Sequence, residues 1–247
     1  MPKKLKLDLI NPGGLPFQLA LKSAVFFILL FLVDYNLLVF LLFIFFAFYF
    51  YFRPRLNSGR FFYSFLTLVS VSLIIAGKLP VSSYRFLFVL FFGAVFFVLL
   101  GIKNLVFVHP QNFYYIINGL LLLSVFLSFF IADKSHWFIL KYLLAGVAIF
   151  LLSREFLSFF SASTNKFLIL LTSLVFAFLA MEMIWVVALL PMGFLNSSAL
   201  VLLFMLVLED FAVNYFAGGL NRVLVLRNVT IFVLMSLAIF AASHWSI

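Results

Sequence analysis

Long apolar runs follow one another along the whole chain, and most charged residues stand in the short segments between them. Of the 247 residues, 67% are hydrophobic and 9% are charged, whereas soluble domains are roughly half apolar and about a quarter charged. A soluble core of this size cannot hide so many apolar groups without large exposed patches, but a bilayer solvates them directly. The sequence therefore predicts an integral membrane protein, with a single transmembrane domain over residues 1–247.

The spacing of the apolar runs predicts an all-α fold, a polytopic bundle of about nine transmembrane helices. A helix that crosses a bilayer needs roughly 20 mostly apolar residues, because each residue rises about 1.5 Å through about 30 Å of hydrocarbon. The predicted spans are residues 15–33, 35–52, 61–77, 86–102, 113–131, 137–152, 167–190, 198–217 and 228–243.

The first two spans are the hardest to separate, and the distribution of charge decides between one helix and two. Residues 23–52 are apolar except around 34–36, so they form either one overlong tilted helix or two helices joined by a tight polar turn. Two helices and a cytoplasmic N-terminus place twelve Lys and Arg residues inside and three outside, as the positive-inside rule expects. Fusing the helices moves the four N-terminal lysines outside and leaves eight against seven. We therefore predict nine spans, with the N-terminus cytoplasmic and the C-terminus outside. The twelve inside residues are Lys3, Lys4, Lys6, Lys22, Arg53, Arg55, Arg60, Lys103, Arg154, Lys166, Arg222 and Arg227, and the three outside are Lys78, Arg85 and Lys134.

The segment before the first span, residues 1–14, is basic and ends in an Asn-Pro-Gly-Gly turn signal. We expect it to lie at the interface, on anionic lipids of the cytoplasmic leaflet. The net charge of +9 does not predict nucleic-acid binding, because the 16 Lys and Arg residues are spread singly and form no continuous basic face. The expected partners are the lipid bilayer, with anionic lipids at its cytoplasmic face, and a membrane-protein partner or a second copy of the chain.

The residue types exclude several kinds of chemistry. The chain has no cysteine, which rules out disulfides, thiolate catalysis and cysteine-based metal sites. Its histidines predict no metal site, because His109 stands in a predicted cytoplasmic turn while His136 and His244 stand at the predicted outer surface, each just before a Trp. None of the common catalytic or nucleotide-binding motifs occurs. The sequence favours a protein without enzymatic activity and without a cofactor.

Ionisable side chains inside the predicted spans are the candidate site, since each costs roughly 2.5–3.5 kcal/mol on insertion scales. They are Lys141, Glu182, Glu209 and Asp210, and Asn214 lies one helical turn beyond Asp210 on the same face. Their depths from the outer helix ends differ between neighbours by only about one turn. We predict that they form a polar cluster facing the bundle interior, with Lys141 as a counter-charge and Asn214 as a neutral ligand.

Three interpretations of this cluster stay open. In the functional one, the carboxylates couple a cation or proton, or hold a polar headgroup. In the structural one, the polar groups pair with one another or with backbone and hold the seventh and eighth helices together. In the third, the eighth helix covers residues 192–208, so that Glu209 and Asp210 lie at the cytoplasmic interface and residues 211–227 form a surface helix.

The last quarter of the chain carries an intramembrane Glu182, Trp185 three residues later, a helix end at Leu190-Pro191, and Trp245 after two more spans. This pattern resembles the end of uncharacterised polytopic membrane proteins from small-genome candidate bacteria. The resemblance implies a bacterial cytoplasmic membrane location and carries no activity.

The small size, the lack of internal repeats and the scarcity of charge favour a structural or accessory membrane subunit over a self-sufficient transporter. The first alternative is a protein that binds or transports a small solute, an ion or a lipid through the carboxylate cluster. The second is an intramembrane lipid-processing enzyme, which would need a nucleophile or metal ligands that the sequence does not show.

Overall fold

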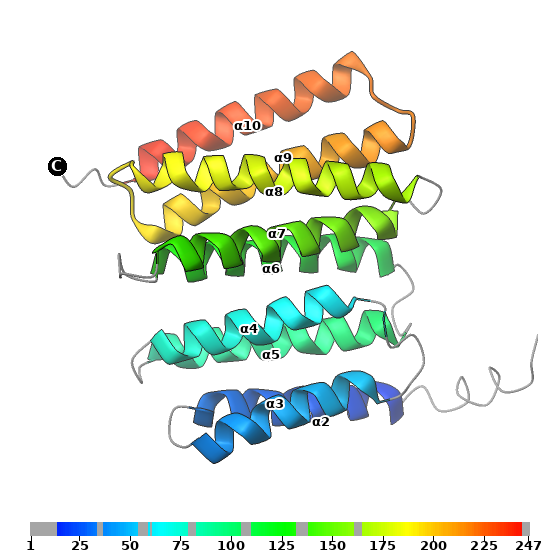
Figure 1. Ribbon diagram of the computed structural model, residues 1–247, viewed down its shortest axis with the longest axis vertical. Coiled ribbons are helices and arrows are strands. Elements are labelled where there is room, and N and C mark those ends of the chain that lie inside the picture. Colours follow the sequence, from blue (N-terminus) through cyan, green and yellow to red (C-terminus); the bar gives the residue numbers. More distant parts are fainter. Residues whose placement is uncertain are drawn as a thin grey trace, which may run out of the picture. The chain divides into compact units, whose positions relative to one another are not determined.

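The structure of the chain, a computed structural model, describes residues 14–33, 37–53, 59, 61–78, 83–104, 110–131, 138–160 and 165–243. Residues 1–13 of the basic N-terminal segment, the predicted polar turn at 34–36 and the three histidines lie outside these residues, and Gly14, the last residue of that segment, begins the first described helix. The described residues form nine α-helices and no strand. They are α2 (Gly14–Leu32), α3 (Leu37–Phe52), α4 (Phe62–Lys78), α5 (Ser83–Lys103), α6 (Pro110–Ile131), α7 (Phe138–Phe160), α8 (Lys166–Ala188), α9 (Phe194–Phe216) and α10 (Arg222–Ala242) (Figure 1).

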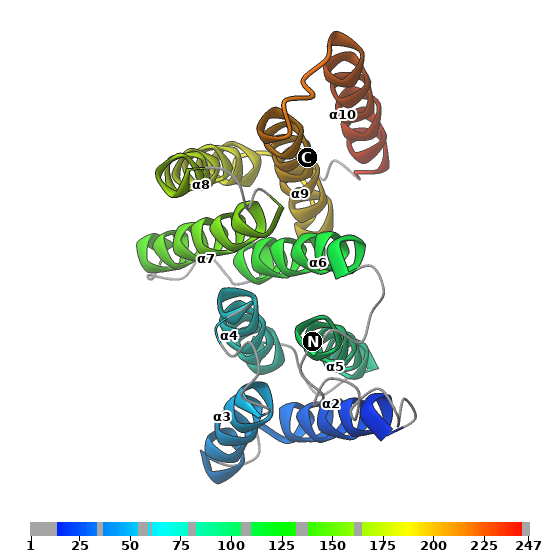
Figure 2. The same cartoon turned by 90° about the vertical axis from the view of Figure 1, so that its right-hand side faces the viewer.

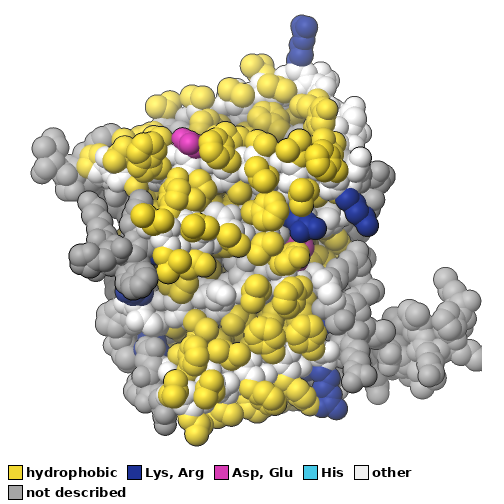
Figure 3. All heavy atoms as spheres, in the orientation of Figure 1, with side chains coloured by type: hydrophobic (Ala, Val, Ile, Leu, Met, Phe, Trp, Pro, Cys, Tyr) yellow, Lys and Arg dark blue, Asp and Glu magenta, His cyan; other side chains and the backbone are white. Residues whose placement is uncertain are grey.

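Six of these helices, α5 to α10, are long and apolar enough to cross a membrane. Helices α2, α3 and α4 are also apolar, but their apolar stretches are shorter, with 17 residues or fewer. Hydrophobic side chains cover most of the described surface in the face drawn in Figure 3. An all-helical fold with several membrane-compatible helices is therefore confirmed.

Two of the open interpretations are wrong. A single fused helix over residues 23–52 is excluded, because α2 ends at Leu32 and α3 begins at Leu37. A surface helix over 211–227 is excluded as well, because α9 continues without a break to Phe216 and α10 begins only at Arg222.

One predicted end was also wrong. The span predicted to end at residue 152 continues as α7 to Phe160. The sequence of residues 153–166, with Arg154 and Glu155 ahead of several apolar residues, suggests a short interfacial turn. Phe156 and Leu157 are fully buried, however, so packing holds residues 153–160 in the helix.

The contacts divide the chain into two compact units, Met1–Ile117 and Asn118–Ile247, with the boundary inside α6. In the first unit, α2 packs against α3, α4 and α5, and α4 packs against both α3 and α5. Aromatic rings fill its core: Phe26 stacks on Phe96 with ring centres 4.3 Å apart, and Tyr51 stacks on Phe65 at 4.1 Å. The prediction of one transmembrane domain stays a prediction.

In the second unit, α7 and α8 form a closely packed hairpin, and α9 contacts α7, α8 and α10 (Figure 2). Gly146 allows the close approach of α7 to α8, since a Cβ atom there would lie 3.0 Å from the Met181 sulfur. Helix α10 packs against α9, and Asn228 is its buried residue. The second unit therefore leaves most of α10 exposed, along with one face of α8.

Candidate functional site

Helix α9 carries two consecutive carboxylates, Glu209 and Asp210. They stand near the middle of its C-terminal half, which is the half that the sequence predicts to be cytoplasmic. Successive residues of an α-helix point about 100° apart, because one turn takes 3.6 residues. The two side chains therefore face different neighbours. Glu209 is 1% exposed, whereas the side chain of Asp210 is 31% exposed.

Glu209 is held by Asn118 of α6. The Asn118 side-chain Nδ2 donates to both carboxylate oxygens, at 2.8 Å to Oε1 and 3.0 Å to Oε2. Gly119, the next residue of α6, lies against Leu206 of α9, so the helices are close enough for a short amide to reach the carboxylate. The Oδ1 atom of Asn118 is buried and accepts no hydrogen bond from any described residue. This pair joins α6 to α9 through a buried contact.

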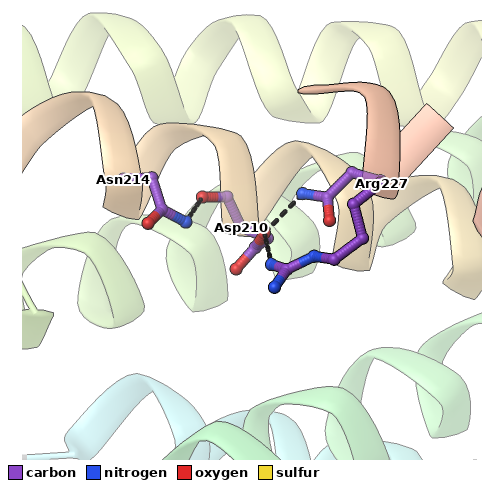
Figure 4. A network of polar contacts seen from close by, with 4 residues as sticks. Asp210, Asn214 and Arg227 are labelled. Carbon is purple, nitrogen blue, oxygen red and sulfur yellow. Dashed lines mark hydrogen bonds and ion pairs between the residues drawn. The ribbon is translucent and has the colours of Figure 1, made fainter. Parts of the chain in front are cut away.

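Asp210 is held from the other side, by α10 (Figure 4). The side chain of Asn228 donates to its Oδ2 atom, and the Arg227 Nη2 atom lies 3.9 Å from the same oxygen. Asn214 is also nearby, but its Nδ2 donates at 2.7 Å to the backbone carbonyl of Asp210 and not to the carboxylate. The Asp210 carboxylate therefore joins α9 to α10.

Glu182 lies on a different surface, the exposed face of α8. Within the described part of the chain, its carboxylate takes part in no hydrogen bond and no ion pair. Tyr142 of α7 lies near enough for an electrostatic interaction with Glu182, but it donates its one hydroxyl hydrogen to the Met181 carbonyl at 2.6 Å. Lys141 is half-buried on α7, and no ion pair joins it to the carboxylates of Glu182, Glu209 or Asp210 among the described residues.

The five predicted cluster residues thus fall into separate places. Asp210 and Asn214 lie together, Glu209 faces a different helix, and Glu182 and Lys141 lie outside both contacts. Sequence reasoning missed three residues that bind the carboxylates: Asn118, Asn228 and Arg227. Asn118 carried a usable signal, since it is a polar side chain within a predicted span, whereas Asn228 and Arg227 stood at a predicted helix start.

Two amide–carboxylate contacts and one long ion pair can fix helices against each other. Among the described residues, no three His, Cys, Asp or Glu side chains lie together so as to bind a metal ion. Comparison with protein families, with curated proteins and with solved structures gives no match to this chain.

Proposed function

We propose that this chain is a non-enzymatic accessory subunit of a membrane-protein assembly, and that it binds its partner along the exposed face of α8. The observation that carries the proposal is the position of Glu182. A charged side chain within a transmembrane helix costs roughly 2.5–3.5 kcal/mol on insertion scales, and such side chains almost always face a protein interior or a water-filled cavity. Glu182 faces neither within the described part of its own unit.

Glu182 stands in an exposed apolar stripe along α8. The stripe follows the helical spacing of three and four residues, so its members share one face. Glu182 lies six residues before the end of α8 at Ala188, about 9 Å along the helix axis, and thus within the apolar part of the helix. We call these residues the α8 stripe: Leu171, Leu174, Val175, Phe178, Glu182, Trp185, Val186 and Leu189.

The chemistry of the stripe defines the partner. Lipid tails offer no hydrogen-bond donor, and even a neutral carboxyl group keeps polar atoms that hydrocarbon cannot satisfy. A transmembrane helix that carries one Lys or Arg at the depth of Glu182 supplies both the donor and the opposite charge. The apolar residues above and below then pack against that helix. Trp185 and Phe178 provide the large side chains that anchor protein interfaces.

The other carboxylates support the accessory function over transport. Glu209 and Asp210 are bonded to two different helices, so they tie α6, α9 and α10 together and do not line a shared site. A transport pathway through the predicted cluster would bring Glu182 to the same place, whereas Glu182 lies on an outward face.

The proposal is tested with the full chain in bilayers and two designed transmembrane helices of Leu and Ala. One probe carries a single Lys at the depth of Glu182, and the other carries Leu at that position. Because the chain has no cysteine, a Phe178→Cys variant places one thiol on the α8 stripe for cross-linking to a thiol in the probe. We expect the Lys probe to associate roughly tenfold more strongly than the Leu probe, since intramembrane polar contacts contribute about 1–2 kcal/mol in model peptides.

The Glu182→Leu substitution in this background should abolish the difference between the probes. The Leu226→Cys variant, whose thiol lies on the exposed side of α10, is the matched control and should cross-link equally weakly to both. Equal association of both probes with the unsubstituted stripe would refute the proposal. Efficient cross-linking between the Phe178→Cys thiols of two copies of the chain would refute it in favour of self-association.

We also propose that all nine helices span a bacterial cytoplasmic membrane, with the N-terminus inside. The charge asymmetry of twelve against three supports this orientation. The resemblance of the last quarter of the chain implies the bacterial cytoplasmic membrane. Helices α3 and α4, with 16 and 17 residues, are short for a hydrocarbon core of about 30 Å, and local thinning of the bilayer accommodates such lengths. In intact cells, a membrane-impermeant maleimide should label Met192→Cys and leave Gly59→Cys and Gly219→Cys unlabelled. The opposite pattern would overturn the orientation.

A further inference from the structure

Three cations gather at the C-terminal end of α3 in the first unit. Lys22 of α2 donates through Nζ to the backbone carbonyl of Arg53, at 2.9 Å. Lys103, the last residue of α5, donates to the carbonyl of Tyr51 and lies 4.0 Å from the centre of the Tyr51 ring. Lys22 lies close enough to Arg53, and to Lys103, for their positive charges to repel each other. The C-terminal end of one helix thus receives three positive charges from three elements.

The helix end accounts for only part of this charge. A helix C-terminus carries about half a negative elementary charge, and lysines commonly bond its last carbonyls. Each ammonium group has three donors, and each lysine here uses one of them on a carbonyl. The described part of the first unit contains no Asp or Glu. Lys103 is moreover 2% exposed, and a buried charge needs a compensating partner. The described residues therefore supply no negative group at this end of α3.

A shallow and largely open apolar groove, lined by side chains of α3 and by Arg53 just after it, runs along this helix to the same place. Its volume is about 500 Å³. The guanidinium group of Arg53 stands at one end, where it donates to the Tyr49 hydroxyl and lies 5.4 Å from the centre of the Tyr49 ring. The groove therefore joins an aromatic, apolar wall to a positively charged end. Its lining consists of Ile44, Phe45, Phe48, Tyr49, Phe52 and Arg53.

We propose that this region is a binding site for one phospholipid with an anionic headgroup. The exposed guanidinium of Arg53 binds the phosphate, for which its planar fork of donors is well suited. The half-buried ammonium of Lys22 adds a second positive charge beside it, and Lys103 contributes through its field. One acyl chain lies in the groove along α3. The site is in the first unit and does not depend on the partner surface of α8.

The proposal is tested by native mass spectrometry of the full chain with phosphatidylglycerol and with phosphatidylcholine of the same acyl chains. Each basic residue near an anionic lipid contributes about a factor of five in affinity. We expect the double variant Arg53→Gln/Lys22→Gln to lose about thirtyfold in affinity for phosphatidylglycerol and to bind the two lipids equally. Arg53→Lys should keep part of the preference, because a point charge replaces the planar fork.

Arg222→Gln is the matched control, since Arg222 is an exposed cation at the start of α10 in the second unit. It should leave the preference unchanged. Inorganic phosphate and lysophosphatidylglycerol distinguish the sources of the anion: the single-chain lipid should compete with phosphatidylglycerol, and phosphate at the same concentration should not. Full competition by phosphate would overturn the lipid assignment. Equal binding of the two diacyl lipids to the unsubstituted chain, or an equal effect of Arg222→Gln, would overturn the site.

Discussion

Glu209 and Glu182 are the same residue type in neighbouring apolar helices of one unit, and they are satisfied in opposite ways. Glu209 is 1% exposed, and both of its carboxylate oxygens accept hydrogen bonds from Asn118. Glu182 lies on an exposed apolar face and takes part in no hydrogen bond or ion pair with any described residue. Both residues lie within the apolar length of their helices, and the direction in which each side chain points decides whether it meets another helix of the same chain.

The difference separates two roles for a carboxylate in a membrane. For an inward carboxylate such as Glu209, a hydrogen-bond donor on another helix of the same chain offsets the free-energy cost of burial. Removing one of the two partners therefore lowers the free energy of unfolding. For an outward carboxylate such as Glu182, which has no donor within the described chain, the free-energy cost of placing it in the membrane has to be offset by a group outside the chain. Asp210 is intermediate between the two. Its side chain is 31% exposed, accepts a hydrogen bond from Asn228 of α10 and forms a long ion pair with Arg227 of the same helix.

The largest loss of stability is expected for Asn118→Leu. This change removes the donor of Glu209 and leaves a carboxylate buried without a bond, so the free energy of unfolding should fall by about 3 kcal/mol. Reversible unfolding of the full chain in mixed micelles, followed by circular dichroism, measures the loss.

The matched control is the double variant Asn118→Leu/Glu209→Leu. Replacing both partners by apolar groups of similar size is often nearly neutral, so the double variant should recover most of the lost stability. A double variant as unstable as Asn118→Leu would show that the loss comes from packing of α6 against α9 and not from the unpaired carboxylate.

A smaller effect is expected for Asn228→Leu, which removes the amide donor of Asp210. Hydrogen bonds between transmembrane helices contribute about 0.6 kcal/mol on average and at most about 1.7, so a loss of about 1 kcal/mol should follow in the same unfolding assay. Asn221→Leu is the control at the start of the same helix, because Asn221 directly precedes α10 and its side chain makes no capping hydrogen bond. Equal losses in the two variants would mean that Asn228 does not hold α10 to α9.

A still smaller effect is expected for Arg227→Gln. The Arg227–Asp210 pair is 3.9 Å long, with side chains 62% and 31% exposed, and exposed pairs of this kind contribute about 0.5 kcal/mol or less. Unfolding midpoints of Arg227→Gln and Asn228→Leu, compared side by side, rank the two contacts. A larger loss for Arg227→Gln would reverse the ranking and make the cation the main partner of Asp210.

The sequence predicted the helices well because length and charge carry that information. The span predicted at 113–131 is α6, Pro110–Ile131, and the polar interruption after residue 33 separates α2 from α3 as the charge count required. The end of α7 was missed because Arg154 and Glu155 ahead of apolar residues suggest a short interfacial turn. Only the burial of Phe156 beside them shows that the helix continues.

The hydrogen-bond partners of the carboxylates could not be predicted from the sequence, for a different reason. When almost every position of a helix is apolar, the periodicity that marks a buried face disappears. Asn118 and Glu209 are 91 residues apart, and no pattern indicates that they face each other. The same loss of periodicity hid the outward direction of Glu182, so the predicted cluster combined side chains that the fold keeps on different surfaces.

The smallest effect on stability is expected for Glu182→Leu, and it separates the two roles most clearly. The chemical change is the same as Glu209→Leu, but Glu182 gives up no hydrogen bond or ion pair with a described residue and only a weak electrostatic interaction with Tyr142. The free energy of unfolding should therefore stay within about 0.5 kcal/mol of the unsubstituted chain, the usual range for surface substitutions. Glu209→Leu should lose more, because it leaves both polar atoms of the buried Asn118 side chain unsatisfied. If Glu182→Leu instead lowers the free energy of unfolding of the isolated chain as much as Glu209→Leu, then Glu182 stabilises its own bundle. The proposal that the α8 stripe binds a cationic helix would then be refuted. If it leaves stability intact and also removes the preference for the Lys probe, the outward carboxylate acts between proteins and the inward one within the fold.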